Sequence, residues 1–138
     1  MFLLDTNTIS EMIKKKPDSR VMHELEFHQN EIVTAAPVWH ELNFGCNRLS
    51  LSKKRKQIEA FLEEIISQSL EILPYDKKAA AWHAKERARL SAKGLTPPFV
   101  DGQIASIAFV NNLTLVTRNF RDFEFFSDLS VESWHLSY

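Results

Sequence analysis

The sequence has few glycines, a single cysteine and no long hydrophobic run. Its 138 residues include 3 glycines, and they contain neither G-x-x-x-x-G-K-[ST] nor G-x-G-x-x-G. Without these phosphate-binding loops, a P-loop nucleotidase and a dinucleotide-binding domain are disfavoured. The lone Cys46 excludes an intrachain disulfide and a zinc site built from several cysteines. We expect Cys46 to be a small packed side chain.

Signals for export or membrane insertion are also missing. Residues 1–5 include no basic residue, and the fifth residue is already an aspartate. A secretory signal peptide would instead have a basic start followed by a longer apolar run. No apolar run approaches the roughly 18 residues that span a bilayer. We therefore expect no membrane contact and a location in the reducing cytoplasm.

The residues that are present fit one globular domain over 1–138. Hydrophobic residues make up 44% and charged residues 25% of the chain, which is typical of a folded domain. The length suffices for one hydrophobic core and is too short for two. The net charge is −1. If four acids were gathered in one site, the remaining surface would be mildly basic, which suits a polyanionic substrate.

Segments typical of strands and of helices alternate along the chain. The predicted strands are 2–4, 32–34, 70–73 and 113–117, with a last edge strand at 131–134. The first predicted helix begins near Asp5 and ends by Pro17, and the second extends from Ser19 to His28. Two more begin at Pro37 and after Ser52. The last two begin after Asp76, ending near Lys93 just before Gly94, and near Val100. This order predicts an α/β fold, a mainly parallel central sheet covered by helices on both faces.

The predicted sheet brings polar residues together at one edge. Ligands of parallel sheets bind outside the carboxyl ends of the strands. Asp5 and Asn119 each lie just past the end of a predicted strand. We expect these two residues on the same rim.

Four of the 18 acidic residues stand among apolar neighbours. Asp5 follows a buried strand, Asp101 opens an apolar helix, and Asp122 lies between two phenylalanines. Glu41 lies on a helix with apolar residues around it, where a buried glutamate needs a partner. Local alternatives exist: Asp5 and Asp101 could be helix caps, and Asp122 could cap a turn. Other acids are assigned to solvated faces, namely Glu59, Glu63, Glu64, Glu71 and Glu86.

Four carboxylates in one site require compensation. Two of them about 6 Å apart repel by roughly 3 kcal/mol at an effective dielectric constant of about 20. The cluster must therefore bind cations or take up protons. Oxygen ligands without histidine or cysteine favour Mg²⁺ or Mn²⁺. An ion held in this way typically meets phosphate, where it can lower the pKa of a bound water and neutralise charge on the phosphoryl oxygens.

The other polar residues offer weaker candidates. No catalytic histidine is expected, because His23 and His28 do not share a helix face and His40 points away from Glu41. The basic runs at 14–16 and 53–56 are either solvated helix ends or contacts for the phosphates of a polyanionic substrate. Arg118 is the better candidate for reaching a phosphate.

Four motifs, in matching order and spacing, resemble those of PIN-domain proteins. They are Leu4-Asp5-Thr6-Asn7-Thr8-Ile9-Ser10, Glu41-Leu42-x-x-Gly45, Asp101-x-x-Ile104-Ala105 and Thr117-Arg118-Asn119-x-x-Asp122-Phe123. The resemblance spans nearly the whole chain. The short length is similar to that of the VapC-type toxins of prokaryotic toxin–antitoxin pairs.

The resemblance implies a three-layer α/β/α sandwich and an endoribonuclease that depends on Mg²⁺ or Mn²⁺. It also implies a homodimer that is inhibited by a cognate antitoxin. Carried over by position, the catalytic and metal-binding acids are Asp5, Glu41, Asp101 and Asp122, and the supporting polar residues are Asn7, Thr117 and Asn119. The sequence departs from many relatives at Trp39-His40, and at Asn119, where some relatives carry an acid.

Two other classes compete with this interpretation. One is a binding module that keeps the PIN fold and acts through partner contacts alone. The other is a different Mg²⁺-dependent phosphohydrolase. A haloacid-dehalogenase-like phosphatase would need D-x-D-x-T, but Asn7 stands at the second aspartate. A receiver domain would need two adjacent acids after the first strand and a late lysine, which Thr6 and Thr117-Arg118 do not supply.

Overall fold

Five strands form one central sheet in the computed structural model, which describes residues 1–136. The strands are β1 (Phe2–Leu4), β2 (Ile32–Ala35), β3 (Ile72–Leu73), β4 (Thr114–Val116) and β5 (Val131–Glu132). Their order across the sheet is β3-β2-β1-β4-β5, and each neighbouring pair is parallel. The prediction of a mainly parallel sheet is confirmed.

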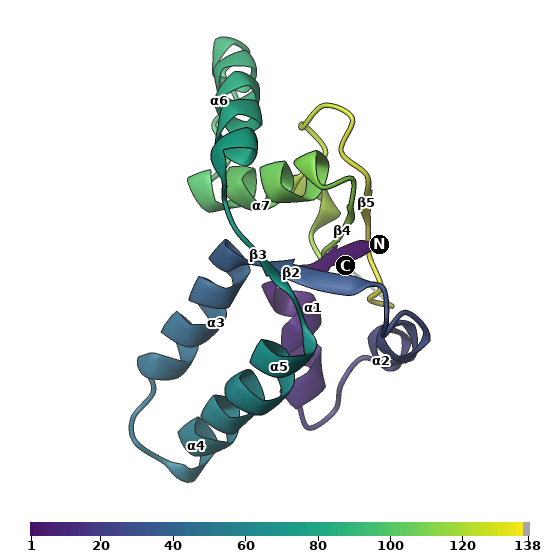
Figure 1. Cartoon of the computed structure of the whole chain (residues 1–138), viewed down its shortest axis with the longest axis vertical. Coiled ribbons are helices and arrows are strands. Elements are labelled where there is room, and N and C mark those ends of the chain that lie inside the picture. Colours follow the sequence, from purple (N-terminus) through teal and green to yellow (C-terminus); the bar gives the residue numbers. More distant parts are fainter. Residues whose placement is uncertain (137–138) are drawn as a thin grey trace.

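Helices cover both faces of this sheet. They are α1 (Thr6–Ser10), α2 (Ser19–Phe27), α3 (Ala36–Asn47), α4 (Lys53–Ala60), α5 (Ser67–Ser69), α6 (Lys77–Ala92) and α7 (Phe99–Val110). In Figure 1, α1 to α5 lie on one side of the strands and α6 and α7 on the other. This is the expected result of right-handed crossovers that run outward from β1 to β3 and then return to β4. The three-layer sandwich is confirmed.

The central strand β1 is buried on both sides. Leu3 and Leu4 point to opposite faces of the sheet, and both are fully buried. Beside them on β4, Leu115 and Val116 are fully buried as well. Asp5 follows directly, and its backbone N–H donates to the Val116 carbonyl at 3.1 Å. The hydrophobic core therefore holds the chain rigidly up to the point where the first acid appears.

Helix boundaries follow local capping. The Ser52 hydroxyl accepts from the Arg55 N–H at 3.1 Å, and the Asp76 carboxylate accepts from the Ala79 N–H at 2.9 Å. Both side chains satisfy backbone donors at a helix start that would otherwise lack partners. Gly94, just past α6, has φ +77°, a conformation that glycine adopts without strain. The predicted starts of α4 and α6 and the end of α6 are confirmed.

Several elements are shorter than predicted. The segment 70–73 pairs only over β3, and 131–134 only over β5. The first helix ends at Ser10 and continues as a 3-10 helix over Glu11–Ile13, before Pro17. The reason is Glu11, which is buried and accepts from the Asp18 N–H at 2.8 Å. This long-range bond turns the chain toward α2.

Glu86 corrects another expectation, because it is not on a solvated face. The side chain is 6% exposed, and its carboxylate accepts from the Arg89 guanidinium at 2.9 Å and 3.0 Å. It also accepts from the backbone N–H of Ser127 at 2.6 Å. The pairing with Arg89, followed by the bond from Ser127, holds the pKa of Glu86 below its usual value. Cys46 is buried, as expected.

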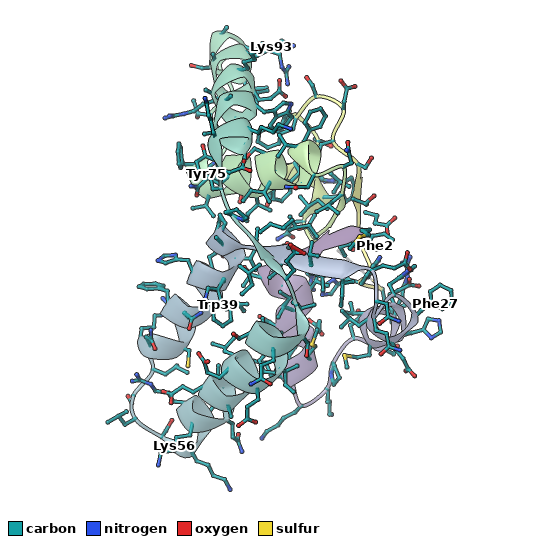
Figure 2. All side chains as sticks on the ribbon, viewed as in Figure 1. Phe2, Phe27, Trp39, Lys56, Tyr75 and Lys93 are labelled. Atoms are coloured by element: carbon teal, nitrogen blue, oxygen red, sulfur yellow. The ribbon has the colours of Figure 1, made fainter. Side chains whose placement is uncertain are left out.

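A close contact between α6 and α7 sets the position of the first turn of α7. A Cβ atom on Gly102 would lie 2.1 Å from Nε2 of His83. His83 is buried, and its Nδ1 lies 2.8 Å from the Tyr75 hydroxyl. The missing side chain at Gly102 thus allows α6 to approach the turn that carries Asp101. From this contact α6 extends away from the sheet to Lys93 (Figure 2).

Within residues 1–136, no helix combines the length and the apolar character that crossing a membrane requires.

Substituting Gly102 tests this contact. We expect Gly102→Ala to lower the free energy of unfolding by about 1–3 kcal/mol, because the added methyl group overpacks against His83. The measurement is denaturant unfolding. Gly45→Ala is the matched control: no atom lies within 4 Å of its Cβ position on α3, so it should leave stability unchanged or raise it by up to about 1 kcal/mol. Equal stabilities of the two variants would contradict the role of Gly102.

Candidate active site

Side chains from separate segments meet at the carboxyl edge of the sheet. They surround a cavity of about 130 Å³. Its lining consists of Asp5, Thr6, Asn7, Glu41, Asp101, Ile104, Thr117, Asn119, Asp122 and Phe123. The structure thus places the four acids and the three supporting residues of the sequence motifs at one cavity. We call it the acidic cavity. Within residues 1–136, no histidine lines it.

Asp5 is the most buried of the four acids. It caps α1, and its carboxylate accepts from the Thr8 N–H at 3.1 Å and from the Thr8 hydroxyl at 3.0 Å. The Thr117 hydroxyl also bonds this carboxylate. Burial raises the pKa of Asp5, and the bonds from Thr117 and Thr8 oppose that rise without cancelling it. Asp5 is therefore both the cap of α1 and a residue of the acidic cavity.

Asp101 lies in the first turn of α7, inside the helix. The helix begins at Phe99 after Pro98, so the alternative that Asp101 is a helix cap is wrong. The pKa of Asp101 is raised to about 6, first by burial and then by the charges of Asp122, Glu41 and Asp5, in that order. The fold therefore places ionisable carboxylates where they repel one another.

Glu41 differs from its sequence expectation in exposure. It is exposed on α3, whereas Val38 and Leu42 on the same helix are buried. The Thr6 hydroxyl donates to its carboxylate at 3.2 Å. Glu41 therefore faces the acidic cavity from the solvent side, and it does not need a buried partner. Asp122 is also exposed, at the end of the 3-10 helix that follows β4.

The threonines do more to hold the acids than the sequence motifs suggested. Asn7 is exposed and lines the cavity, but the groups that donate to Asp5 come from Thr8 and Thr117. Thr117 is buried, and its hydroxyl also accepts from the Asn119 N–H at 3.2 Å. The contact between Thr8 and Asp5 could have been predicted from the sequence, because the third residue of a helix normally donates its N–H to the capping side chain.

Arg118 lies beside the acidic cavity and not in its lining. It contributes to a neighbouring cavity of about 480 Å³, lined by Arg118, Asn119, Phe120, Arg121 and Asp122. The two cavities share Asn119 and Asp122. Arg121, which sequence reasoning did not single out, adds a second guanidinium at the same place. We call this the arginine cavity.

The two basic runs of the sequence come together elsewhere. Lys14 and Lys15 lie with Lys53 and Lys54 around a cavity of about 940 Å³. The lysines that follow the α1 segment and those that begin α4 thus form one basic surface, although the two runs are far apart in the sequence.

The raised pKa of Asp101 predicts how stability depends on pH. The folded pKa of about 6 lies above the usual aspartate value of 3.8, so the folded state binds more protons between these values and loses stability as the pH rises through them. Asp101→Asn removes the ionising group. In a chelator, we expect the variant to have a higher Tm than the wild type at pH ~7.5, with the difference shrinking toward pH ~4. Thermal unfolding at both pH values is the measurement, and a variant less stable at the higher pH would refute the repulsion.

Comparison with known proteins agrees with the motifs. The sequence profile of the PIN domain matches residues 2–128. Ribonuclease VapC2 of Rickettsia felis is 36% identical over 135 residues, which cover 97% of this chain and 98% of the relative. Toxin FitB of Neisseria gonorrhoeae is 34% identical over 139 residues, with 98% and 99% covered. Among solved structures, VapBC2 of Rickettsia felis bound to a DNA fragment from its promoter has a TM-score of 0.83 at 33% identity, with 96% of this chain and 98% of that chain covered.

These matches extend over every segment that contributes to the acidic cavity. The matched range 2–128 contains Asp5, Glu41, Asp101 and Asp122. The relatives also match in length, and the solved structure matches in fold. The resemblance stated from the four motifs is confirmed: the chain belongs to the PIN domain family, with VapC and FitB toxins among its relatives.

Proposed function

We propose that this chain is an endoribonuclease toxin that hydrolyses RNA phosphodiester bonds and is neutralised by a cognate antitoxin. The observation that carries the proposal is the acidic cavity, where four carboxylates from separate segments meet and Asp101 has a pKa raised to about 6. A module that acted only through partner contacts would gain nothing from this repulsion. The relatives named ribonuclease and toxin support the same conclusion.

The chemistry of the acidic cavity fits a divalent metal ion. Its possible ligands are carboxylate, amide and hydroxyl oxygens, which favour Mg²⁺ or Mn²⁺. Among residues 1–136, no three His, Cys, Asp or Glu side chains are gathered closely enough to hold an ion by themselves. Mg²⁺ usually keeps several waters and completes its shell with substrate phosphates. An open set of acids is therefore consistent with an ion that binds together with RNA.

Asp5 and Asp101 are the residues we assign as the main metal ligands. Bound there, Mg²⁺ or Mn²⁺ would lower the pKa of a water ligand and offset charge on the phosphoryl oxygens. Thr8 and Thr117 hold the Asp5 carboxylate in one orientation, so it needs little rearrangement. Glu41 faces the cavity with its carboxylate bonded to Thr6, where it binds an ion or positions the attacking water.

The arginine cavity supplies the contact with RNA. Arg118 and Arg121 lie next to Asp122, which lines both cavities. A guanidinium group binds phosphate oxygens in a bidentate manner, so it can hold a phosphate next to the one being cleaved. Asp122 is exposed, and we assign it the most weakly held position at the acidic cavity.

Partner and location form part of the same proposal. The similar VapBC2 structure was solved bound to DNA from its promoter. As the family resemblance implies, we infer that this chain forms a complex with a small antitoxin. We propose that the toxin is a cytoplasmic homodimer, as the family resemblance implies. The free, buried Cys46 is compatible with a reducing compartment.

RNA cleavage with site variants tests the proposed function. We expect Asp5→Asn and Asp101→Asn each to lower cleavage by more than about 100-fold while the fold is retained, because each removes a ligand for the ion that stabilises the developing charge. Removal of Mg²⁺ and Mn²⁺ with a chelator should have the same effect on the wild type. The measurement is cleavage of labelled RNA, with circular dichroism to check folding.

Asp128→Asn is the matched control for these two variants. Asp128 is an exposed acid outside the acidic cavity, at φ +58°, a backbone conformation that asparagine also adopts. The Asp128→Asn variant should cleave RNA at the wild-type rate. Undiminished cleavage by Asp5→Asn or Asp101→Asn, or full activity of the wild type in a chelator, would disprove the assigned site.

A further inference from the structure

An apolar cavity opens beside two of the acids, next to the acidic cavity. It measures about 300 Å³, and Leu95, Pro97, Pro98 and Phe125 form its apolar walls. Thr96, Asp101 and Asp122 complete the lining, and the two acids also line the acidic cavity. The apolar cavity therefore adjoins the acidic cavity.

Phe125 is the aromatic side chain of the apolar cavity, and it is turned outward. It is 42% exposed, whereas the nearby Phe123 and Phe126 are 4% and 5% exposed. The ring of Phe126 packs near that of Trp82 on α6, with ring centres 6.1 Å apart. Two of the three rings thus anchor the loop in the core, and the third is left at the surface beside the acids.

The ion pair between buried Glu86 and half-buried Arg89 fixes this loop against α6. The Arg89 guanidinium donates to the Phe125 carbonyl at 2.7 Å, and Glu86 accepts from the Ser127 N–H at 2.6 Å. Figure 1 shows the loop that follows β4 extending beside α6. Bonds to the Phe125 carbonyl and from the Ser127 N–H restrict this part of the backbone, so little conformational entropy would be lost if the Phe125 ring bound a ligand.

The surroundings of Asp122 match the parts of a nucleotide. Asp122 lines both the arginine cavity, where Arg118 and Arg121 suit a phosphate, and the apolar cavity, where Phe125 and the prolines suit an apolar ring. A single-stranded nucleic acid carries both chemistries in every unit, an anionic backbone and a base with a π-face. Bases of single-stranded RNA are commonly bound by stacking on aromatic side chains.

We propose that the apolar cavity binds an unpaired base of the RNA next to the cleaved phosphate, and that this base stacks on the ring of Phe125. The inference rests on the proposed ribonuclease function, which it extends from the phosphate to the base. The same apolar walls would also accept an apolar side chain of a protein partner. The base is favoured because the cavity shares two carboxylates with the acidic cavity, and because one of them, Asp122, also lines the arginine cavity.

Kinetics of Phe125 variants test the stacking. With labelled single-stranded RNA in Mg²⁺ or Mn²⁺, we expect Phe125→Ala to raise KM by about 5- to 100-fold with kcat nearly unchanged. Phe125→Trp should keep the wild-type KM, and Phe125→Leu, which is apolar but has no ring, should fall between. Phe27→Ala is the matched control, because Phe27 is 72% exposed on α2, apart from α6 and α7 (Figure 2); its KM should not change.

A competition experiment separates stacking from a structural effect. An RNA oligonucleotide and an abasic oligonucleotide of the same length are compared as inhibitors of cleavage. The wild type should bind the base-bearing inhibitor more tightly, and Phe125→Ala should reduce this preference by the factor by which its KM rises. A merely structural loss would weaken both inhibitors equally, and that result would overturn the inference.

Other outcomes also decide. If Phe125→Ala and Phe27→Ala have the same KM, or if Phe125→Ala alters the oligomeric state in light scattering and leaves KM unchanged, the apolar cavity does not bind a base. If the wild type cleaves no RNA, the proposed function fails on its own. Fluorescence anisotropy with the same two oligonucleotides then still measures whether Phe125 contributes a preference for bases.

Discussion

Electrostatic repulsion between the carboxylates is the constraint on which this site depends. Asp101 has a pKa near 6 because it is partly buried and because three other acids lie within range of it. Such an arrangement costs folding free energy at neutral pH, so the remaining structure must supply rigidity. It does so from the hydrophobic core: Asp5 follows the fully buried Leu3 and Leu4, and its N–H is bonded to the Val116 carbonyl at the end of β4.

The other acids are held by elements that contact one another independently of the site. Asp101 lies where α7 begins, and the contact between Gly102 and His83 sets the distance of that turn from α6. Glu41 reaches the cavity from α3 and is bonded to Thr6 at the start of α1. Because Asp5, Asp101 and Glu41 are supported from different directions, this part of the site can keep its shape without an ion that draws the acids together.

Function then follows from what surrounds the acids. Asp122 stands between a cavity with two arginines and a cavity walled by prolines and a phenylalanine. The helix α6, on the opposite face of the sheet from α1 to α5, takes part through Glu86 and Arg89, which hold the loop of Phe125. Residues far from the proposed chemistry therefore shape the surface that an RNA strand would contact.

Local pattern was enough to predict the strands, the capped helices, the parallel sheet and the acids that follow strand ends, because alternation, caps and apolar runs act over a few residues. It could not predict that Glu86 is buried or that Glu41 is exposed, since burial depends on which helix face meets the sheet. Nor could it indicate Phe125, whose exposure depends on the burial of its neighbours Phe123 and Phe126. Long-range packing alone decided these features, because the partners involved, such as Glu86 and Ser127, are distant in the chain and become neighbours only after folding.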